Sequence, residues 1–217
     1  MPQVHSDSVL VTTQNAAGNK LDYYLRRQVG YTLRLDPVGG SRDARVDGRL
    51  DVRLDNTGPD SGLPQIVIGP YDPRFAPGEN RSYVSVYTPL AATGATLDGH
   101  PEPVYTGTEV GRNVYSAFLS LPARSSHTLA VNVSGSVHLD ADGWYTLTLV
   151  RQPMLNPDDV AVTLEAPAGW RFAALRGLEQ AGENRATGRF RLDHTTTVRV
   201  RLAAETSDVW QRLVDGR

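Results

Sequence analysis

The residue types that most often carry chemistry are present in this sequence, but they are scattered along it. No two histidines are two, three or four residues apart, the spacings at which one strand or helix presents paired metal ligands. They are His5, His100, His127, His138 and His194. Cysteine is absent, which excludes a disulfide framework, a thiolate metal site and a thiol nucleophile. We therefore expect no metal site, no cofactor and no catalytic residue.

The acidic residues of the expected loops raise the question of glycoside hydrolysis. That reaction needs two carboxylates about 5–10 Å apart in a cleft, one of them in an apolar pocket. The loop candidates are Asp60, Asp72, Glu79, Glu102 and Glu109. Nothing in their sequence context selects a pair. A glycan-processing enzyme is therefore our third hypothesis, behind two binding functions.

Aromatic residues form the first group that suggests binding. Tyr71, Phe75, Tyr83 and Tyr87, with Tyr105 and Tyr115, would meet at one end of the fold if the loop between them folds back. If they are exposed, they suit stacking on sugar rings or the centre of a protein interface. If they are buried, they are core residues. We name the first four as candidate ligand or interface residues.

Arginines near the C-terminus form the second group. Alternation predicts strands over Gly188–Leu192 and Thr197–Leu202, joined by a hairpin turn at Asp193–Thr196. Arg189, Arg191, Arg199 and Arg201 would then face outward on adjacent strands. Four guanidinium groups on one face could bind an anionic polymer through forked hydrogen bonds. The alternative is a solvated face whose charges are balanced by neighbouring acids.

The stretch Gly58–Leu90 contains the loop that the aromatic residues need. It is rich in proline and glycine around the apolar run Ile66–Ile68, and it passes into a strand-like run at Ser82–Thr88. Loops longer than about 12–15 residues are usually functional or disordered. This loop has too much apolar surface for a disordered linker. We expect an ordered cap over one end of a β-sandwich, with binding through Tyr71 and Phe75 as the alternative.

Period-two alternation predicts an all-β protein around these groups. In Arg45–Asp55 the even positions are apolar or glycine, and the odd positions alternate between arginine and aspartate, which describes a strand with one buried face. Further strands follow at short, turn-separated intervals, and about seven of them in roughly 110 residues match an immunoglobulin-like domain. We expect an antiparallel immunoglobulin-like sandwich over residues 29–137.

A second block of strand patterns runs over residues 138–205. We expect a second, small β-domain there; the alternative is that its strands complete the first sandwich. Residues 1–28 would be a junction segment with a strand at Ser8–Gln14 and either a short helix or a strand at Lys20–Arg27. Residues 206–217 would be a tail with a short C-terminal helix capped by Ser207 or Asp208.

Bulk composition narrows the class of partner. The 217 residues carry a formal net charge of −2 with both signs interspersed, which argues against a nucleic-acid binder. No stretch approaches the ~18 consecutive apolar residues that a membrane-spanning helix needs. The first residues, Met1–His5, lack the basic start and apolar core of a signal peptide. We expect neither a nucleic-acid partner nor membrane insertion by this chain.

Several separate segments resemble, in order, one protein family. They are Asn15–Leu25, Ser61–Pro64, Asn80–Leu90, Glu109–Tyr115, Arg151–Pro153 and Asn156–Asp158. Over nearly the whole chain the sequence resembles the C-terminal β-rich region of an uncharacterised, membrane-anchored actinobacterial family, domain of unknown function 4012. The resemblance implies a parent protein with an N-terminal membrane anchor. It also implies an extracytoplasmic α/β domain similar to envelope glycopolymer transferases of the LytR-CpsA-Psr type. No catalytic residues carry over.

These observations lead to two ranked binding hypotheses. The first is a non-catalytic, extracytoplasmic β-sandwich module of a cell-envelope protein. Its partners would be the preceding α/β domain of the parent protein, another envelope protein or an anionic glycopolymer. The second is a carbohydrate-binding module that uses the loop aromatic residues.

Overall fold

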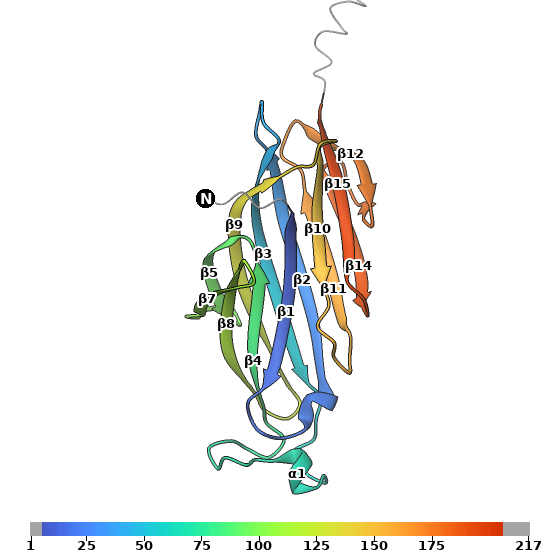
Figure 1. The fold of residues 1–217 in the computed structure, drawn as a ribbon. Helices are drawn as coiled ribbons and strands as arrows, with labels where there is room; N and C mark the ends of the chain where they lie inside the picture. Colours follow the sequence, from blue (N-terminus) through green and yellow to red (C-terminus); the bar gives the residue numbers. More distant parts are fainter. Residues whose placement is uncertain (1–5, 206–217) are drawn as a thin grey trace, which may run out of the picture.

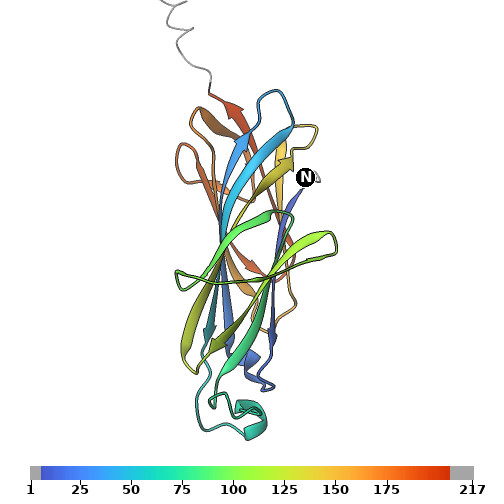
Figure 2. The ribbon, with the colours of Figure 1, turned by 90° about the vertical axis from the view of Figure 1, so that its left-hand side faces the viewer.

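The structure is a computed structural model that describes residues 6–205, and it is built almost entirely of β-strands. Two twisted sheets lie face to face, and the apolar core fills the space between them (Figures 1 and 2). The core-facing side chains are the alternate apolar residues of the long strands, as period-two patterning requires. The predicted all-β class is confirmed.

The first sheet has seven strands in the order β12-β15-β10-β1-β4-β8-β7. Their bounds, in chain order, are β1 (Asp7–Asn15), β4 (Asn80–Thr88), β7 (Tyr105–Glu109), β8 (Arg112–Leu121), β10 (Trp144–Val150), β12 (Trp170–Arg176) and β15 (Thr196–Ala204). Val84 and Val86 of β4 point into the core, so Arg81, Tyr83 and Tyr87 lie on the outer face of this sheet.

The second sheet has eight strands in the order β13-β14-β11-β2-β3-β9-β5-β6. Their bounds are β2 (Leu25–Pro37), β3 (Asp43–Asn56), β5 (Ala91–Leu97), β6 (His100–Pro101), β9 (Ser125–His138), β11 (Asp158–Glu165), β13 (Glu179–Gln180) and β14 (Arg185–Leu192). The arginine–aspartate ladder that alternation predicts is present on the outer face of β3, with ion pairs such as Arg49–Asp51 at 2.9 Å.

Each sheet contains one parallel pair, so the sheets are mixed and the purely antiparallel arrangement we expected is not what forms. β1 pairs with β10 in parallel, and β2 pairs with β11 in parallel. The connections β1–β2 and β10–β11 both run from the first sheet to the second, and they run in the same direction, so β1 lies parallel to β10 and β2 parallel to β11. Alternation predicts which side chains of a strand face the core, but it carries no information about the direction of the strand relative to its neighbours. For this reason the sequence did not predict the two parallel pairs.

The second block of strands joins both sheets of the first block. β10, β12 and β15 extend the first sheet beyond β1, while β11, β13 and β14 extend the second beyond β2. One hydrophobic cluster takes residues from both blocks, for example Leu50 from β3 and Leu147 from β10. Both sheets therefore contain strands from before and after the boundary expected between residues 137 and 138. This arrangement corresponds to the alternative in which the later strands complete the first sandwich.

The loop between β3 and β4 lies at one end of the two sheets (Figure 1). It contains one short helix, α1 (Gln65–Ile68), which includes the apolar run Ile66–Ile68. Ile68 is buried, and the carbonyl oxygens of Val67 and Gly78 accept hydrogen bonds from the backbone of Lys20 and the side chain of Asn56. The loop is thus fastened to the β1–β2 connection and to the end of β3, as a cap would be.

The sequence leaves a helix or a strand open for Lys20–Arg27 and predicts a short helix near the C-terminus. A 3-10 helix, η1 (Leu21–Tyr24), occupies the first half of Lys20–Arg27, and β2 begins directly after it, so this stretch is part helix and part strand. The helix expected at 207–214 lies outside the described residues. Within 6–205 there is no helix long and apolar enough to cross a membrane.

Candidate binding surface

Two neighbouring strands of the first sheet place aromatic side chains opposite one another on its outer face. Tyr83 of β4 and Phe118 of β8 are direct cross-strand partners. Tyr105 lies on β7, the edge strand beyond β8. Phe75, from the capping loop, contacts Arg81, which also contacts the Phe118 ring. We call Phe75, Arg81, Tyr83, Tyr105 and Phe118 the aromatic patch.

Arg81 and the rings hold one another in place. The guanidinium carbon of Arg81 lies 5.0 Å from the centre of the Phe118 ring and 5.1 Å from the centre of the Phe75 ring, within cation–π range. The Tyr83 and Phe118 ring centres are 4.6 Å apart, and Tyr105 meets Phe118 edge to face at 6.3 Å. These are the separations at which aromatic pairs attract. The patch is therefore pre-organised before any partner arrives.

The patch is open to solvent at its centre and at its edge. Phe118 is 41 % exposed and Tyr105 is 64 % exposed, although both are large aromatic residues. Most of the large apolar side chains lie in the core instead. An exposed, ordered cluster of rings beside an arginine has the composition of an interface hot spot or a sugar-stacking platform.

The structure brings only some of the predicted aromatic residues together. Phe75 contacts Arg81, and Tyr83 contacts Phe118, the second ring that Arg81 contacts. Tyr71 is 60 % exposed and packs beside Gly18 at the base of the loop, apart from these contacts. Tyr87 donates a hydrogen bond of 2.9 Å to Glu109, which raises the pKa of the tyrosine. Tyr115 is buried on the core side of β8, the role left open as its alternative.

The four C-terminal arginines do not share a face, so that prediction is wrong. β14 pairs with β11 and β13, whereas β15 pairs with β10 and β12, so the two strands lie in different sheets. Arg189 and Arg191 face outward from the second sheet, and Arg199 and Arg201 face outward from the first. The chain crosses between sheets at Asp193–Thr196 instead of making a hairpin there. Their role as ligands stays a prediction.

Arg189 and Arg191 do border a hollow on the second sheet. Gly30 of β2 is the cross-strand neighbour of Ala161 of β11, and these two small residues leave a depression of about 590 Å³. It adjoins a further hollow of about 790 Å³ that shares Ala161 and Arg189 and is lined also by Arg185. Asp159 and Glu179 are the acids of this trough, so its charge is weakly positive.

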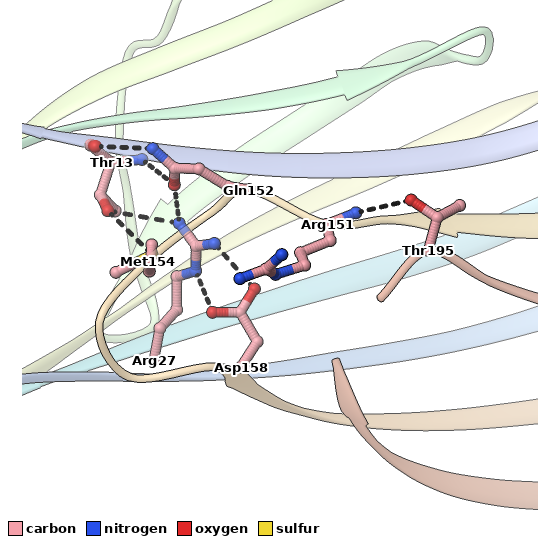
Figure 3. A network of polar contacts seen from close by, with 7 residues as sticks. All are labelled: Thr13, Arg27, Arg151, Gln152, Met154, Asp158 and Thr195. Atoms are coloured by element: carbon pink, nitrogen blue, oxygen red, sulfur yellow. Dashed lines mark hydrogen bonds and ion pairs between the residues drawn. The ribbon is translucent and has the colours of Figure 1, made fainter. Parts of the chain in front are cut away.

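A buried polar network lies beside the β1–β2 and β10–β11 connections between the sheets (Figure 3). Arg27 of β2 donates to both carboxylate oxygens of Asp158 at the start of β11, at 2.8 and 2.7 Å. It also donates to Gln152 of the β10–β11 loop at 2.9 Å and to Thr13 of β1 at 3.3 Å. Its side chain is fully buried and satisfied within the protein, so it serves structure and offers nothing to a ligand.

A second buried group is the carboxyl of Asp7, which is fully enclosed between the sheets. The hydroxyls of Tyr145 and Tyr31 donate to one of its oxygens at 2.6 and 3.2 Å, and the backbone N–H of Ser8 donates to the other at 2.7 Å. Burial raises the pKa of Asp7, and these hydrogen bonds oppose the rise. Burial and the neighbouring carboxyl also raise the pKa of both tyrosines.

Four of the five loop carboxylates considered for glycoside hydrolysis have separate partners. Asp72 pairs with Arg74, which lowers its pKa to about 2, and Asp60 lies 3.8 Å from Arg124. Glu79 accepts a hydrogen bond from Ser120, and Glu109 accepts one from Tyr87. Within residues 6–205 no group of three histidine, aspartate or glutamate side chains could hold a metal ion.

Sequence reasoning missed two members of the patch, Arg81 and Phe118. The signal for Phe118 was present, because it alternates with the apolar residues Ala117 and Leu119 and must therefore face away from the core. Tyr105 had been noted among the aromatic residues, but the strand that carries it was not predicted. Register between β4 and β8, which brings Phe118 opposite Tyr83, needs the structure.

Comparison with known proteins adds information on the fold alone. No family model matches this chain, and no curated protein matches it. A crystal structure of a candidate nutrient-binding protein from Legionella pneumophila subsp. pneumophila str. Philadelphia 1 is similar with a TM-score of 0.53 and 8 % identity, over 92 % of this chain and 72 % of that one. An M1 zinc metallopeptidase mutant from Deinococcus radiodurans reaches a TM-score of 0.39 at 14 % identity, over 81 % of this chain and 42 % of that one, too little to inform on this chain.

Proposed function

We propose that this chain is a non-catalytic binding module of a cell-envelope protein, placed outside the cytoplasm, and that the aromatic patch is its contact surface. The observation that carries the proposal is the exposed, arginine-ordered ring cluster around Phe118. Its partner would be a protein or a glycopolymer of the envelope. The preceding α/β domain implied by the family resemblance is one such protein.

The geometry of the aromatic patch suits binding because its side chains lose little conformational entropy when a partner binds. The rings stand on paired strands or are held against Arg81, so little side-chain freedom remains to be lost on association. Central aromatic and arginine residues carry most of the energy of typical interfaces, often ≥2 kcal/mol each. Removing the central ring should therefore weaken binding far more than removing a ring outside the patch.

The experiment is co-sedimentation of the purified protein with the envelope fraction of an actinobacterium. Phe118→Ala and Tyr105→Ala should each lower the bound fraction. Tyr71→Ala is the control: its side chain is about as exposed as that of Tyr105 but lies outside the patch, so the bound fraction should stay unchanged. Binding that survives both patch substitutions, or equal losses for all three variants, would refute the assignment of the contact surface.

The second candidate, a carbohydrate-binding module, is favoured by the accessibility of Tyr105. An exposed tyrosine on a strand offers a ring for stacking on a sugar and a hydroxyl for a hydrogen bond. A glycan array carrying bacterial wall saccharides tests this candidate. Specific binding that is lost in Tyr105→Ala supports it, and an array without signal from a protein that still sediments with envelopes points to a protein partner.

We also propose that the fold is an immunoglobulin-like sandwich and that one partner is an anionic glycopolymer. An immunoglobulin-like sandwich is supported by the two facing sheets and their many antiparallel pairs. An anionic glycopolymer partner is supported by the trough that Arg185, Arg189 and Arg191 border on the second sheet. Contact between that trough and a linear polymer would leave the aromatic patch free for the protein partner.

A further inference from the structure

Three arginines gather around one tryptophan on the outer face of the first sheet, at the opposite edge from the aromatic patch. Trp144 begins β10, and Arg201 of the neighbouring strand β15 is its direct cross-strand partner. Arg176 of β12 lies beyond β15, opposite Arg199. The guanidinium carbons of Arg176, Arg199 and Arg201 lie 4.8, 4.9 and 5.6 Å from the Trp144 ring centre.

The charges of this cluster are not balanced by the acids around it. Arg199 forms an ion pair with Asp140, whose other oxygen accepts from the backbone N–H groups of Asp142 and Trp144. In the described part of the chain, neither Arg176 nor Arg201 forms an ion pair, and both are exposed. The Nε of Arg199 is buried and has no hydrogen-bond partner. Three cations thus face one carboxylate, and donors remain unused.

Such crowding needs a compensating interaction. Guanidinium groups that surround a single ring repel one another because they carry the same charge. Cation–π attraction to the Trp144 ring offsets part of this repulsion. Stacking on the ring also fixes the guanidinium planes, which leaves their N–H forks directed to the side. An oxyanion between the forks would accept the unused donors and relieve the repulsion.

We propose that Arg176, Arg199 and Arg201, arranged around Trp144, form a binding site for a phosphoryl group. The ligand class is a multiply charged phosphate, because its several acceptor oxygens match several forked donors. The phosphoryl group can come from a small diphosphate or from a phosphodiester polymer. This site involves different residues from the aromatic patch and does not depend on the function proposed for it.

The test uses Trp144 as its own reporter. In a Trp170→Phe/Trp210→Phe background Trp144 is the only tryptophan, since the chain has three. Sodium pyrophosphate should change its emission saturably, and sodium chloride at matched ionic strength should not. A polyphosphodiester of the teichoic-acid type forms a second arm. Tighter binding of the polymer than of pyrophosphate, counted per phosphate, identifies a polymer source, and the reverse identifies a small diphosphate.

Matched substitutions separate binding from a structural role. Arg176→Gln/Arg201→Gln should weaken pyrophosphate binding at least tenfold, while Arg171→Gln, also on β12 but without a contact to Trp144, should not. Asp140→Asn keeps an oxygen for the backbone N–H groups and removes the competing charge, so it should tighten binding. Isothermal titration of the unmodified protein and the same three variants gives the same comparison if the tryptophan background folds poorly.

The proposal is overturned by any of three results. These are the absence of a saturable response to pyrophosphate and to the polymer, a response that chloride reproduces at equal ionic strength, and equal affinities of the double variant and the unmodified protein.

Discussion

Asp7 is a carboxyl placed where water cannot reach it, and its surroundings are built to hold it. Tyr145, Tyr31 and the Ser8 backbone donate to its oxygens, and the positive charge of Arg112 lies close enough to lower its pKa. Burial outweighs these effects and leaves the pKa above its ordinary value of 3.8. The residue therefore ties stability to pH without any place in the binding surface.

Asp7→Asn should change how stability varies with pH. A carboxyl whose pKa is raised by folding contributes stability that is fully present below its unfolded pKa of 3.8 and is lost as pH rises through the folded pKa. Relative to Asp7→Asn, the unmodified protein should therefore be most stable below pH 3.8 and should lose that advantage as the pH rises above this value. Urea unfolding at several pH values measures this, and parallel profiles for the two proteins would contradict it.

Gly48→Ala tests the packing that lets Tyr31 reach Asp7. A Cβ at Gly48 would lie 2.8 Å from Cε2 of Tyr31 and 3.3 Å from its hydroxyl oxygen. Because Tyr31 is fully buried, the clash should cost about 1–3 kcal/mol of unfolding free energy. Gly94→Ala is the control, since nothing lies within 4 Å of a Cβ there. Equal unfolding midpoints in urea for both variants would show that Tyr31 moves freely.

Among the secondary-structure elements, the feature that sequence patterning did not reveal is the pair of connections β1–β2 and β10–β11, which place β1 parallel to β10 and β2 parallel to β11. Thr13, Arg27 and Asp158 come from three different strands around these crossings, and Gln152 comes from the loop between β10 and β11 (Figure 3). A lone arginine among the core positions of β2 was the available signal, because Arg27 precedes Val29 and Tyr31 on the buried face. Its partner, 131 residues away in sequence, could not be read from a pattern.

Arg27→Met should leave Asp158 buried without a partner and cost about 3–5 kcal/mol of unfolding free energy. The double variant Arg27→Met/Asp158→Leu removes both charges, so it should be more stable than Arg27→Met alone. Arg34→Met breaks the exposed pair with Asp36 and should change stability by about 0–1 kcal/mol. Chemical denaturation of the four proteins decides the matter. A double variant less stable than Arg27→Met would mean that the network contributes more than charge pairing.

At the scale of the whole molecule, alternation and turn residues predicted most of the long strands and the all-β class, because each long strand has one buried face. These signals did not predict the short strands β6, β7 and β13. Their residues are exposed, so their sequences show no alternation of apolar and polar residues. Strand order, direction and cross-strand register arise from contacts between distant segments. The aromatic patch depends on that register, which is why its members were only partly predicted.

The sharing of both sheets between the two blocks of strands predicts how the protein unfolds. β1 is hydrogen-bonded to β10, and β2 is hydrogen-bonded to β11. If one block of strands unfolded, the other block would lose these backbone partners and expose part of the shared core. Scanning calorimetry should show one transition whose calorimetric and van't Hoff enthalpies agree. Two resolved transitions would restore the division into domains 29–137 and 138–205.

We propose that the chain binds an envelope component through the aromatic patch, and the affinity of a patch variant for isolated envelopes tests this proposal. Tyr105→Ala/Phe118→Ala should bind at least tenfold more weakly than the unmodified protein, while Tyr71→Ala should keep full affinity and all three proteins should unfold at similar temperatures. Full-strength binding by the double variant, or no binding by the unmodified protein, would contradict it.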